Sequence, residues 1–149
     1  MQSTDTVEDQ FDTEQAQSRD WATIGLVGGA VLLTLATSYI HSTLGGLLFT
    51  LNALGYAALA VAIVLPIRLL DRFRWLIRLA LLGFTLLTIG GWVLFGARYN
   101  VAYLTKAIEA VLVALLVVSI YRFDGGPAGV VARLRKLPTE LVGLVRGGR

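Results

Sequence analysis

The chain has 149 residues, of which 56% are hydrophobic and only 15% charged, and its mean hydropathy is +0.71. These values exclude an ordinary soluble globular domain and indicate a membrane protein. There is no cysteine, which excludes disulfides, thiolate metal sites and a catalytic thiol.

Residues 1–20 form an acidic, polar segment ahead of the first apolar stretch. They carry six carboxylates against the single cation Arg19, whereas a secretory signal peptide begins with positive charge. The segment has too few large apolar residues to bury the surface that would order it. We therefore predict a disordered, solvated tail, with an acidic docking site as the alternative, followed by a helix that stays in the membrane.

Four apolar stretches follow, at residues 21–40, 44–66, 75–97 and 101–121. A bilayer core about 30 Å thick requires roughly 20 helical residues, and each stretch has that length. Because lipid offers backbone amides no water, each stretch must be helical. The short connections make neighbouring helices antiparallel. We therefore predict an all-α fold, an integral membrane four-helix bundle with up-down-up-down topology, in one transmembrane domain at residues 21–121.

The basic residues predict the orientation of this bundle. They gather in the loop at residues 67–74 and in the segment 122–149, whereas the loops 41–43 and 98–100 hold only Arg98. Because Lys and Arg accumulate on the cytoplasmic side, both termini should be cytoplasmic. We predict a multi-pass protein of the cytoplasmic (inner) membrane.

Small residues predict how the helices pack, because close approach of small faces supplies van der Waals contact in lipid. Gly25 and Gly29 form a GxxxG step in the first stretch. The third and fourth stretches hold further small residues: Gly83, Gly90, Gly91, Ala107, Ala110 and Ala114. We expect mainly intramolecular packing, with a homodimer seam through Gly25 and Gly29 as the alternative.

Polar side chains interrupt the apolar pattern at one level of the bundle. Asn52 and Glu109 each lie eight residues into their stretches, roughly 12 Å from the outer ends at about 1.5 Å per residue. The whole predicted layer comprises Thr34, Asn52, Thr88, Lys106 and Glu109.

A carboxylate at this depth costs about 2.5–3.5 kcal/mol on insertion scales, so Glu109 should face the bundle interior and be protonated or paired. Lys106, three residues earlier on the same face, is the nearest partner. Either the layer joins the helices through hydrogen bonds, or it handles a proton, an ion or a small ligand. His41 is predicted to be a solvated residue of the first outer loop, because no further ligand completes a metal site around it.

The segment after Gly125-Gly126-Pro127 carries an amphipathic pattern. Apolar residues recur at intervals of three and four: Val130, Leu134, Leu137, Leu141 and Leu144. The basic residues lie largely off this stripe: Arg133, Arg135, Lys136 and Arg146. This pattern predicts a basic cytosolic tail, at residues 122–149, whose helix lies on the membrane and meets anionic headgroups. A protein partner is the alternative. Pro138 makes two short helices as good a prediction as one.

Two motifs carry a resemblance. They are Gly46-Leu-Leu-Phe-Thr-Leu-Asn52-Ala-Leu-Gly55-Tyr56 and Tyr103-Leu-Thr-Lys106-Ala-Ile-Glu109. On these motifs the chain resembles a group of small, uncharacterised four-span membrane proteins of prokaryotes. The resemblance covers roughly residues 34–118 and excludes both tails. It implies the four-helix fold and brings no function with it.

These observations predict a non-enzymatic membrane protein that acts by association with the bilayer, a membrane protein partner or further copies of itself. No nucleophile–base pair or metal constellation can be assembled from the sequence, so we expect no catalytic residue, metal or cofactor. We also expect no nucleic acid partner. The alternative is a subunit of a small transporter or channel for a proton, a cation or a solute, in which Glu109 titrates or binds the ion.

Overall fold

The computed structural model describes the backbone of residues 5–146 and the side chains of residues 21–68, 70–140 and 142. Over this backbone the chain forms six helices and no strand, which confirms the all-α prediction. Four of them, which we call the four long helices, are also strongly apolar: α1 (Asp5–Thr43), α2 (Leu47–Val64), α4 (Arg74–Phe95) and α5 (Asn100–Asp124). Each contains a segment long and apolar enough to cross a membrane, so the chain fits a multi-pass membrane protein.

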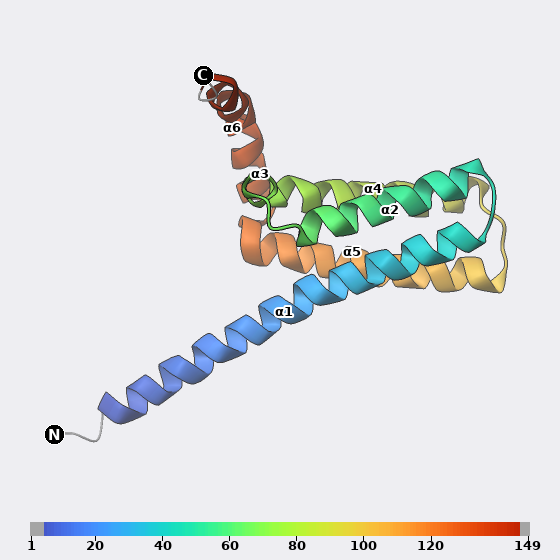
Figure 1. Cartoon of the computed structure of the whole chain (residues 1–149). Coiled ribbons are helices and arrows are strands. Elements are labelled where there is room, and N and C mark those ends of the chain that lie inside the picture. The colour runs from blue at the N-terminus through green and yellow to red at the C-terminus, as the bar shows by residue number, and fades with distance from the viewer. Residues whose placement is uncertain (1–4, 147–149) are drawn as a thin grey trace.

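The four long helices form one antiparallel bundle (Figure 1). Helix α1 packs against α2 and α5, and α4 packs against the same two helices, so the four enclose a shared interior. The hairpin end of the bundle carries the connections 44–46 and 96–99. The tail end carries α3 (Arg68–Arg72) and α6 (Gly126–Arg146). In the 44–46 connection, Gly45 and Gly46 have φ of 70° and 88°, which favours glycine in this tight reversal.

The membrane-spanning segments begin and end within three residues of the predicted stretches, at Trp21–Thr43, Leu47–Val64, Arg74–Phe95 and Asn100–Asp124. The structure differs from prediction before the first of them. Helix α1 begins at Asp5, so residues 5–20, predicted to be disordered, continue the helix. Extending an existing helix adds one hydrogen bond per residue without a new nucleus, which favours this continuation. Residues 1–4 of the predicted tail lie outside the described residues.

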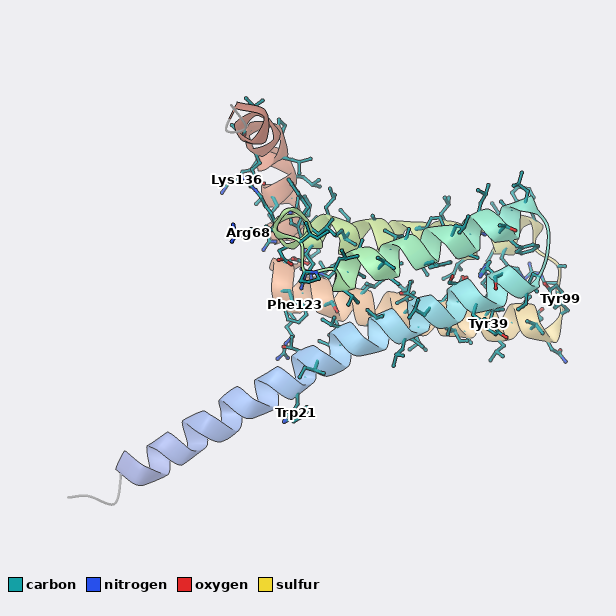
Figure 2. The ribbon with its side chains drawn as sticks, viewed as in Figure 1. Trp21, Tyr39, Arg68, Tyr99, Phe123 and Lys136 are labelled. Atoms are coloured by element: carbon teal, nitrogen blue, oxygen red, sulfur yellow. The ribbon has the colours of Figure 1, made fainter. Side chains whose placement is uncertain are left out.

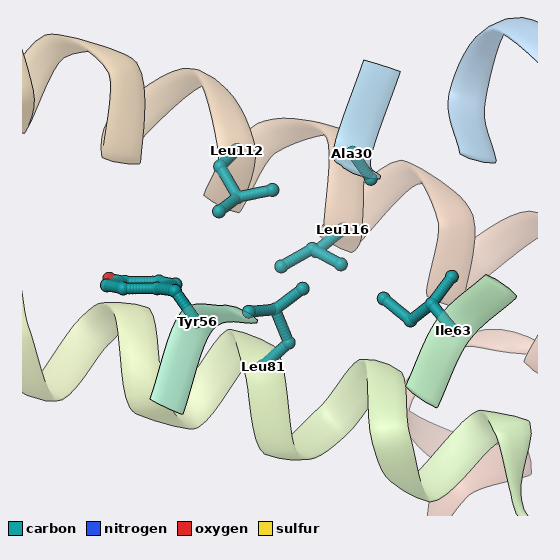
Figure 3. Close-up of a cluster of buried hydrophobic side chains, with 6 residues drawn as sticks. All are labelled: Ala30, Tyr56, Ile63, Leu81, Leu112 and Leu116. Atoms are coloured by element: carbon teal, nitrogen blue, oxygen red, sulfur yellow. The ribbon is translucent and has the colours of Figure 1, made fainter. Parts of the chain in front are cut away.

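A column of apolar side chains from all four long helices fills the interior (Figure 3). It consists of Ala30, Tyr56, Ile63, Leu81, Leu112 and Leu116. Only 11–28% of the most apolar window of each span is buried within the protein. Large apolar side chains such as Leu32, Leu87 and Phe95 point outward. Exposed apolar surface on this scale is expected where lipid, rather than water, surrounds the helices.

Aromatic side chains lie near both ends of the bundle. Tyr39 and Tyr99 lie towards the hairpin end, and Trp21 and Phe123 lie towards the tail end (Figure 2). Trp and Tyr are enriched where helices leave the hydrocarbon core. Their placement therefore fits a bundle whose long axis runs through the bilayer.

The small residues singled out in the sequence contribute less to helix packing than predicted. Gly29 does lie against a neighbour, since a Cβ there would be 3.2 Å from Leu115 Cδ1 of α5. A Cβ would meet nothing within 4 Å at four other predicted glycines: Gly25, Gly83, Gly90 and Gly91. The three alanines of the predicted face are exposed: Ala107, Ala110 and Ala114. Other small residues are buried in the interior, among them Ala30, Ala53, Ala60 and Ala102, so small side chains line it at positions other than most of the predicted ones.

Between two of the four long helices, the closest approach at a glycine was not predicted. A Cβ at Gly55 of α2 would lie 2.7 Å from Phe84 Cζ of α4. The absence of a side chain at Gly55 therefore makes room for the Phe84 ring, which also packs edge-on against Tyr56.

Helix α6 is attached to the bundle through Asp124, whose side chain is 1% exposed. Arg78 of α4 donates from Nε to Asp124 Oδ2 at 2.9 Å and from Nη2 to Oδ1 at 2.6 Å. Arg133 of α6 donates from Nη1 to the same Oδ1 at 3.2 Å. We call these three residues the Asp124 clamp. Charge-assisted and bidentate bonds are among the strongest hydrogen bonds in proteins, so the clamp joins α4, α5 and α6 firmly.

Arg133, predicted to meet lipid headgroups, donates to Asp124 while its side chain stays 44% exposed, and Arg135 and Lys136 are exposed as well. Their role at the membrane surface stays a prediction. The structure corrects the prediction for the tail in one place. Helix α6 is continuous through Pro138, so the two-helix alternative is wrong. A proline removes one backbone donor, and the turns on either side keep their own bonds. The side chains of Leu141, Leu144 and Arg146 lie outside the described residues.

Candidate functional site

Glu109 of α5 is a fully buried carboxylate within the membrane-spanning bundle. Its Oε2 accepts a hydrogen bond from Lys106 Nζ at 2.6 Å and another from Thr88 Oγ1 of α4 at 3.2 Å. Lys106 Nζ also lies 3.4 Å from the Thr88 carbonyl oxygen. This is the pairing that the spacing of three residues predicts, and it compensates the buried charge of the carboxylate.

His41 approaches the other carboxylate oxygen from α1. Its Nδ1 lies 2.9 Å from the Thr37 carbonyl oxygen, and because a carbonyl only accepts, Nδ1 carries the hydrogen. Its Nε2 lies 3.8 Å from Glu109 Oε1, which is buried and has no hydrogen-bond partner among the described residues. With the ring hydrogen on Nδ1, Nε2 only accepts, as does the carboxylate oxygen, so no hydrogen bond joins these two buried groups.

The prediction that His41 is a solvated loop residue is wrong, because the residue is only 3% exposed. Helix α1 continues to Thr43 and therefore includes His41 in its last turn. His41 then falls on the buried face of α1 with Ala30, Thr34 and Thr37, at helical spacings of four, three and four. That run of spacings is the signal in the sequence that identifies His41 as an interior residue.

Tyr56 completes the cluster from α2. Its hydroxyl lies 2.8 Å from Thr88 Oγ1, so Tyr56, Thr88 and Glu109 form a chain of hydrogen-bonding groups across three helices. The His41 ring packs against the Tyr56 ring with centroids 5.7 Å apart. We call this set, drawn from all four long helices, the Glu109 cluster: His41, Tyr56, Thr88, Lys106 and Glu109.

The structure brings together three members of the predicted polar layer and separates two. Thr88, Lys106 and Glu109 are in direct contact. Thr34 is buried, but its hydroxyl donates to the Ala30 carbonyl oxygen of its own helix at 2.6 Å. Asn52 lies on the wall of a neighbouring pocket. Depth alone predicted the level correctly, whereas rotation about the helix axis decides which side chains meet.

A pocket of about 490 Å³ lies beside the Glu109 cluster, towards the hairpin end. Its polar lining consists of His41, Asn52, Thr88, Thr105 and Lys106. Its aromatic lining consists of Phe49, Phe84, Trp92, Phe95 and Tyr99. An apolar cavity of this size with a few converging polar groups is typical of sites for small organic ligands.

Gly91 forms part of the pocket wall. A Cβ at this position would meet nothing within 4 Å, so the glycine leaves the space open. A large side chain at residue 91 would occupy open space at the pocket wall and would leave the interior column in place. Gly83, two helical turns earlier, is equally unobstructed and does not line the pocket, so it offers a matched control position.

The described residues contain no group of three or more His, Cys, Asp or Glu side chains that could hold a metal ion. His41 and Glu109 form a pair without a third ligand, and Lys106 occupies the carboxylate oxygen Oε2.

No family model, curated protein or solved structure matches this chain. The resemblance to small four-span prokaryotic membrane proteins therefore stays a prediction. The Glu109 cluster and the adjoining pocket carry the functional argument.

Proposed function

We propose that this protein acts by association and without catalysis, by binding a small lipid-soluble molecule in the pocket beside the Glu109 cluster. The observation that carries the proposal is the pocket of about 490 Å³ within the spanning helices, with Asn52 and Lys106 on its wall. Polar and charged side chains within a membrane are costly and usually face an interior or a cavity. Both residues face a cavity that a ligand would fill.

Asn52 is the residue that favours ligand binding over a polar layer that only joins the helices. Glu109, Lys106 and Thr88 bond one another across α4 and α5, so interhelical attachment accounts for them. No hydrogen bond from the Asn52 side chain to another described residue is formed, although the residue lies in a spanning helix. An amide without a partner in an apolar environment costs several kcal/mol on some scales, about 1–3 in proteins. A ligand that bonds to Asn52 removes this cost.

A non-enzymatic role is supported by the hydrogen bonds of the two threonine hydroxyls on the wall. Thr88 Oγ1 contacts Tyr56, Glu109 and the Thr85 carbonyl oxygen, and Thr105 Oγ1 donates to the Val101 carbonyl oxygen at 2.7 Å. A nucleophilic hydroxyl needs a neighbouring base that takes its proton. The base that contacts Thr88 is Glu109 Oε2, which is already paired with Lys106 at 2.6 Å.

The location proposed for the protein is the cytoplasmic membrane, with both termini on the cytoplasmic side. The proposal rests on the excess of Lys and Arg near the tail end, including Arg68, Arg72 and Arg74. In this orientation the pocket lies in the outer half of the bilayer. The exposed basic side chains of α6, including Arg135 and Lys136, face the anionic headgroups of the inner leaflet.

A second candidate is proton or cation transport through Glu109, favoured by the unpaired Oε1 that faces His41. Leu81, Leu112 and Leu116 close the interior between Glu109 and the tail end, each at most 1% exposed. Transport would therefore require a second conformation or an oligomer. A pH-dependent flux in vesicles containing the wild-type protein, lost in Glu109→Gln, would favour transport over binding.

The binding proposal is tested with Trp92, which lines the pocket. Trp21→Phe and Trp75→Phe leave Trp92 as the only tryptophan. The detergent-solubilised protein is then titrated with ω-bromodecanol and with ω-bromodecanoic acid, whose bromine quenches tryptophan fluorescence. We expect saturable quenching by at least one probe, retained in Gly83→Phe and lost in Gly91→Phe. Quenching that never saturates, or that is equal in both variants, would contradict the proposal.

A further inference from the structure

We infer that the ligand is a compact lipophilic carboxylic acid, bound as its anion at Lys106, and that its binding takes up one proton at the His41–Glu109 pair. This inference rests on the proposed function, since it assigns the chemistry of the same pocket.

Lys106 is the charged donor on the wall of the pocket. Lys106 has three N–H groups, and two acceptors are in reach of them, Glu109 Oε2 at 2.6 Å and the Thr88 carbonyl oxygen at 3.4 Å. The ammonium lines the pocket together with the amide of Asn52, whereas Glu109 lies behind them and is fully buried. A carboxylate accepts from both donors, and bonds with an ionised partner are the stronger kind.

The charges of the hairpin half also favour an anion. Its described residues include the cations Arg98 and Lys106 and a single carboxylate, Glu109. The Arg98 guanidinium stacks over Trp92 of the pocket wall, 4.3 Å from the ring. In the proposed orientation this half faces away from the cytoplasm. Lys and Arg are usually sparse on that outer side of the membrane. An anionic group would therefore meet Lys106 on the pocket wall, with the exposed Arg98 beside the wall rather than in the interior.

The shape of the pocket indicates the rest of the ligand. The aromatic lining includes Phe84, which packs against Tyr56 of the cluster, together with Trp92, Tyr99 and the largely exposed Phe95. They provide an apolar wall for a hydrocarbon or aromatic body, and the volume suits one compact molecule. The ligand therefore carries one polar end and one apolar body.

Charge balance makes the binding of such an acid proton-linked. Within the buried site, the charge of Lys106 is compensated by Glu109. A ligand carboxylate adds a second negative charge to one ammonium, and an uncompensated charge inside a membrane is costly. Arg98 is solvent-exposed and does not supply the missing positive charge in the interior. A proton that enters with the anion restores neutrality.

The structure identifies where this proton binds. The titratable groups that face Glu109 are His41 from α1, Tyr56 from α2 and Lys106 from α5, while α4 contributes only the uncharged Thr88. Of these, His41 faces Glu109 Oε1: its Nε2 lies 3.8 Å away, too far for a hydrogen bond. His41 also lies on the pocket wall. The proton forms an N–H bond at Nε2 or an O–H bond at Oε1. No bond of the ligand forms or breaks.

The inference is tested by titration calorimetry with ω-bromodecanoic acid in two buffers that differ in ionisation enthalpy, at a pH where the free acid is ionised. The difference in apparent binding enthalpy gives the number of protons taken up. We expect a value close to one for the wild-type protein. We also expect ω-bromodecanol to bind at least about tenfold more weakly, a difference of about 1.4 kcal/mol.

Two variants sharpen the test. In Glu109→Gln, Lys106 alone balances the ligand anion, so we expect retained binding and a proton uptake close to zero. In Lys106→Met, affinity for the acid should fall at least about tenfold while affinity for the alcohol is unchanged. The buffer comparison on the wild-type protein needs no variant, so it remains decisive if either substitution prevents folding.

Each contrary outcome is distinct. If the alcohol binds as tightly as the acid and Gly91→Phe blocks both, the pocket binds ligands but the inferred carboxylate is wrong. If the acid binds with no proton uptake, the role inferred for His41 and Glu109 is wrong. If neither probe binds saturably, the proposed function itself fails.

Discussion

Removal of the charge at Asp124 should release α6 from the bundle. The carboxylate is 1% exposed and accepts two bonds from Arg78 and one from Arg133, all within 3.2 Å. Asp124→Asn keeps the size of the side chain but leaves Arg78, itself only 13% exposed, without its counter-charge. Breaking a buried pair in this way costs about 3–5 kcal/mol. The amide oxygen of asparagine still accepts one hydrogen bond, so we expect the free energy of unfolding to fall by about 3 kcal/mol, the lower end of this range.

The chain offers a matched control at the same end of the bundle. Arg72 Nε lies 3.6 Å from Glu140 Oε2, and the two side chains are 48% and 36% exposed. An exposed pair contributes about 0–1 kcal/mol, so Glu140→Gln should change stability little. Unfolding in mixed detergent measures both variants, and proteolysis at Lys136 reports whether α6 has been released. Equal, small effects of the two substitutions would refute the assignment of Asp124 as the residue that attaches α6.

Three further predictions concern orientation, packing and the tail. Single cysteines placed at Ser3, Thr43, Asn100 and Gly148 of this cysteine-free chain should react with an impermeant thiol reagent in intact cells only at Thr43 and Asn100, and labelling of Ser3 or Gly148 would overturn the proposed topology. Gly29→Leu should destabilise the bundle by about 1–3 kcal/mol, because a Cβ added at Gly29 would lie 3.2 Å from Leu115. Gly25→Leu should have little effect, because a Cβ there would meet nothing within 4 Å. Similar losses of stability for the two variants in detergent unfolding would contradict the packing described. A peptide of residues 127–149 should gain helicity on anionic vesicles and lose affinity as salt shortens the screening length to about 8 Å at 0.15 M and below; equal binding to neutral vesicles would indicate a protein partner.

Hydropathy and length were sufficient to predict the four spans, because the bilayer fixes both the secondary structure and the length of a crossing segment. The level of Glu109 followed from the same count of residues. Its pairing with Lys106 followed from local helix geometry, which needs no knowledge of the other helices.

The partners of Glu109 on other helices could not be predicted in this way. Which side chains meet depends on the rotation of each helix, and one residue of difference turns a side chain by about 100°. His41 was assigned to a loop because the end of α1 was placed three residues too early, and Tyr56 was read as part of an apolar motif. Thr34, at a suitable depth, bonds within its own helix instead.

The clamp at Asp124 was missed for a different reason. Arg78 and Asp124 are 46 residues apart, and no periodic pattern relates them. Their contact arises only when α4 and α5 pack in register. Arg133 was assigned to the polar side of an amphipathic tail, and that pattern carries no information about its contact with Asp124 of the preceding helix.

The identity of molecules that accompany the protein from its own membranes tests the central claim most directly. The wild-type chain, Gly91→Phe and Gly83→Phe are purified in the same mild detergent, and bound small molecules are identified by mass spectrometry. The proposed pocket predicts a lipophilic acid that accompanies the wild-type protein and Gly83→Phe and is absent from Gly91→Phe. The same set of molecules in all three preparations would contradict the claim that this pocket is a ligand site.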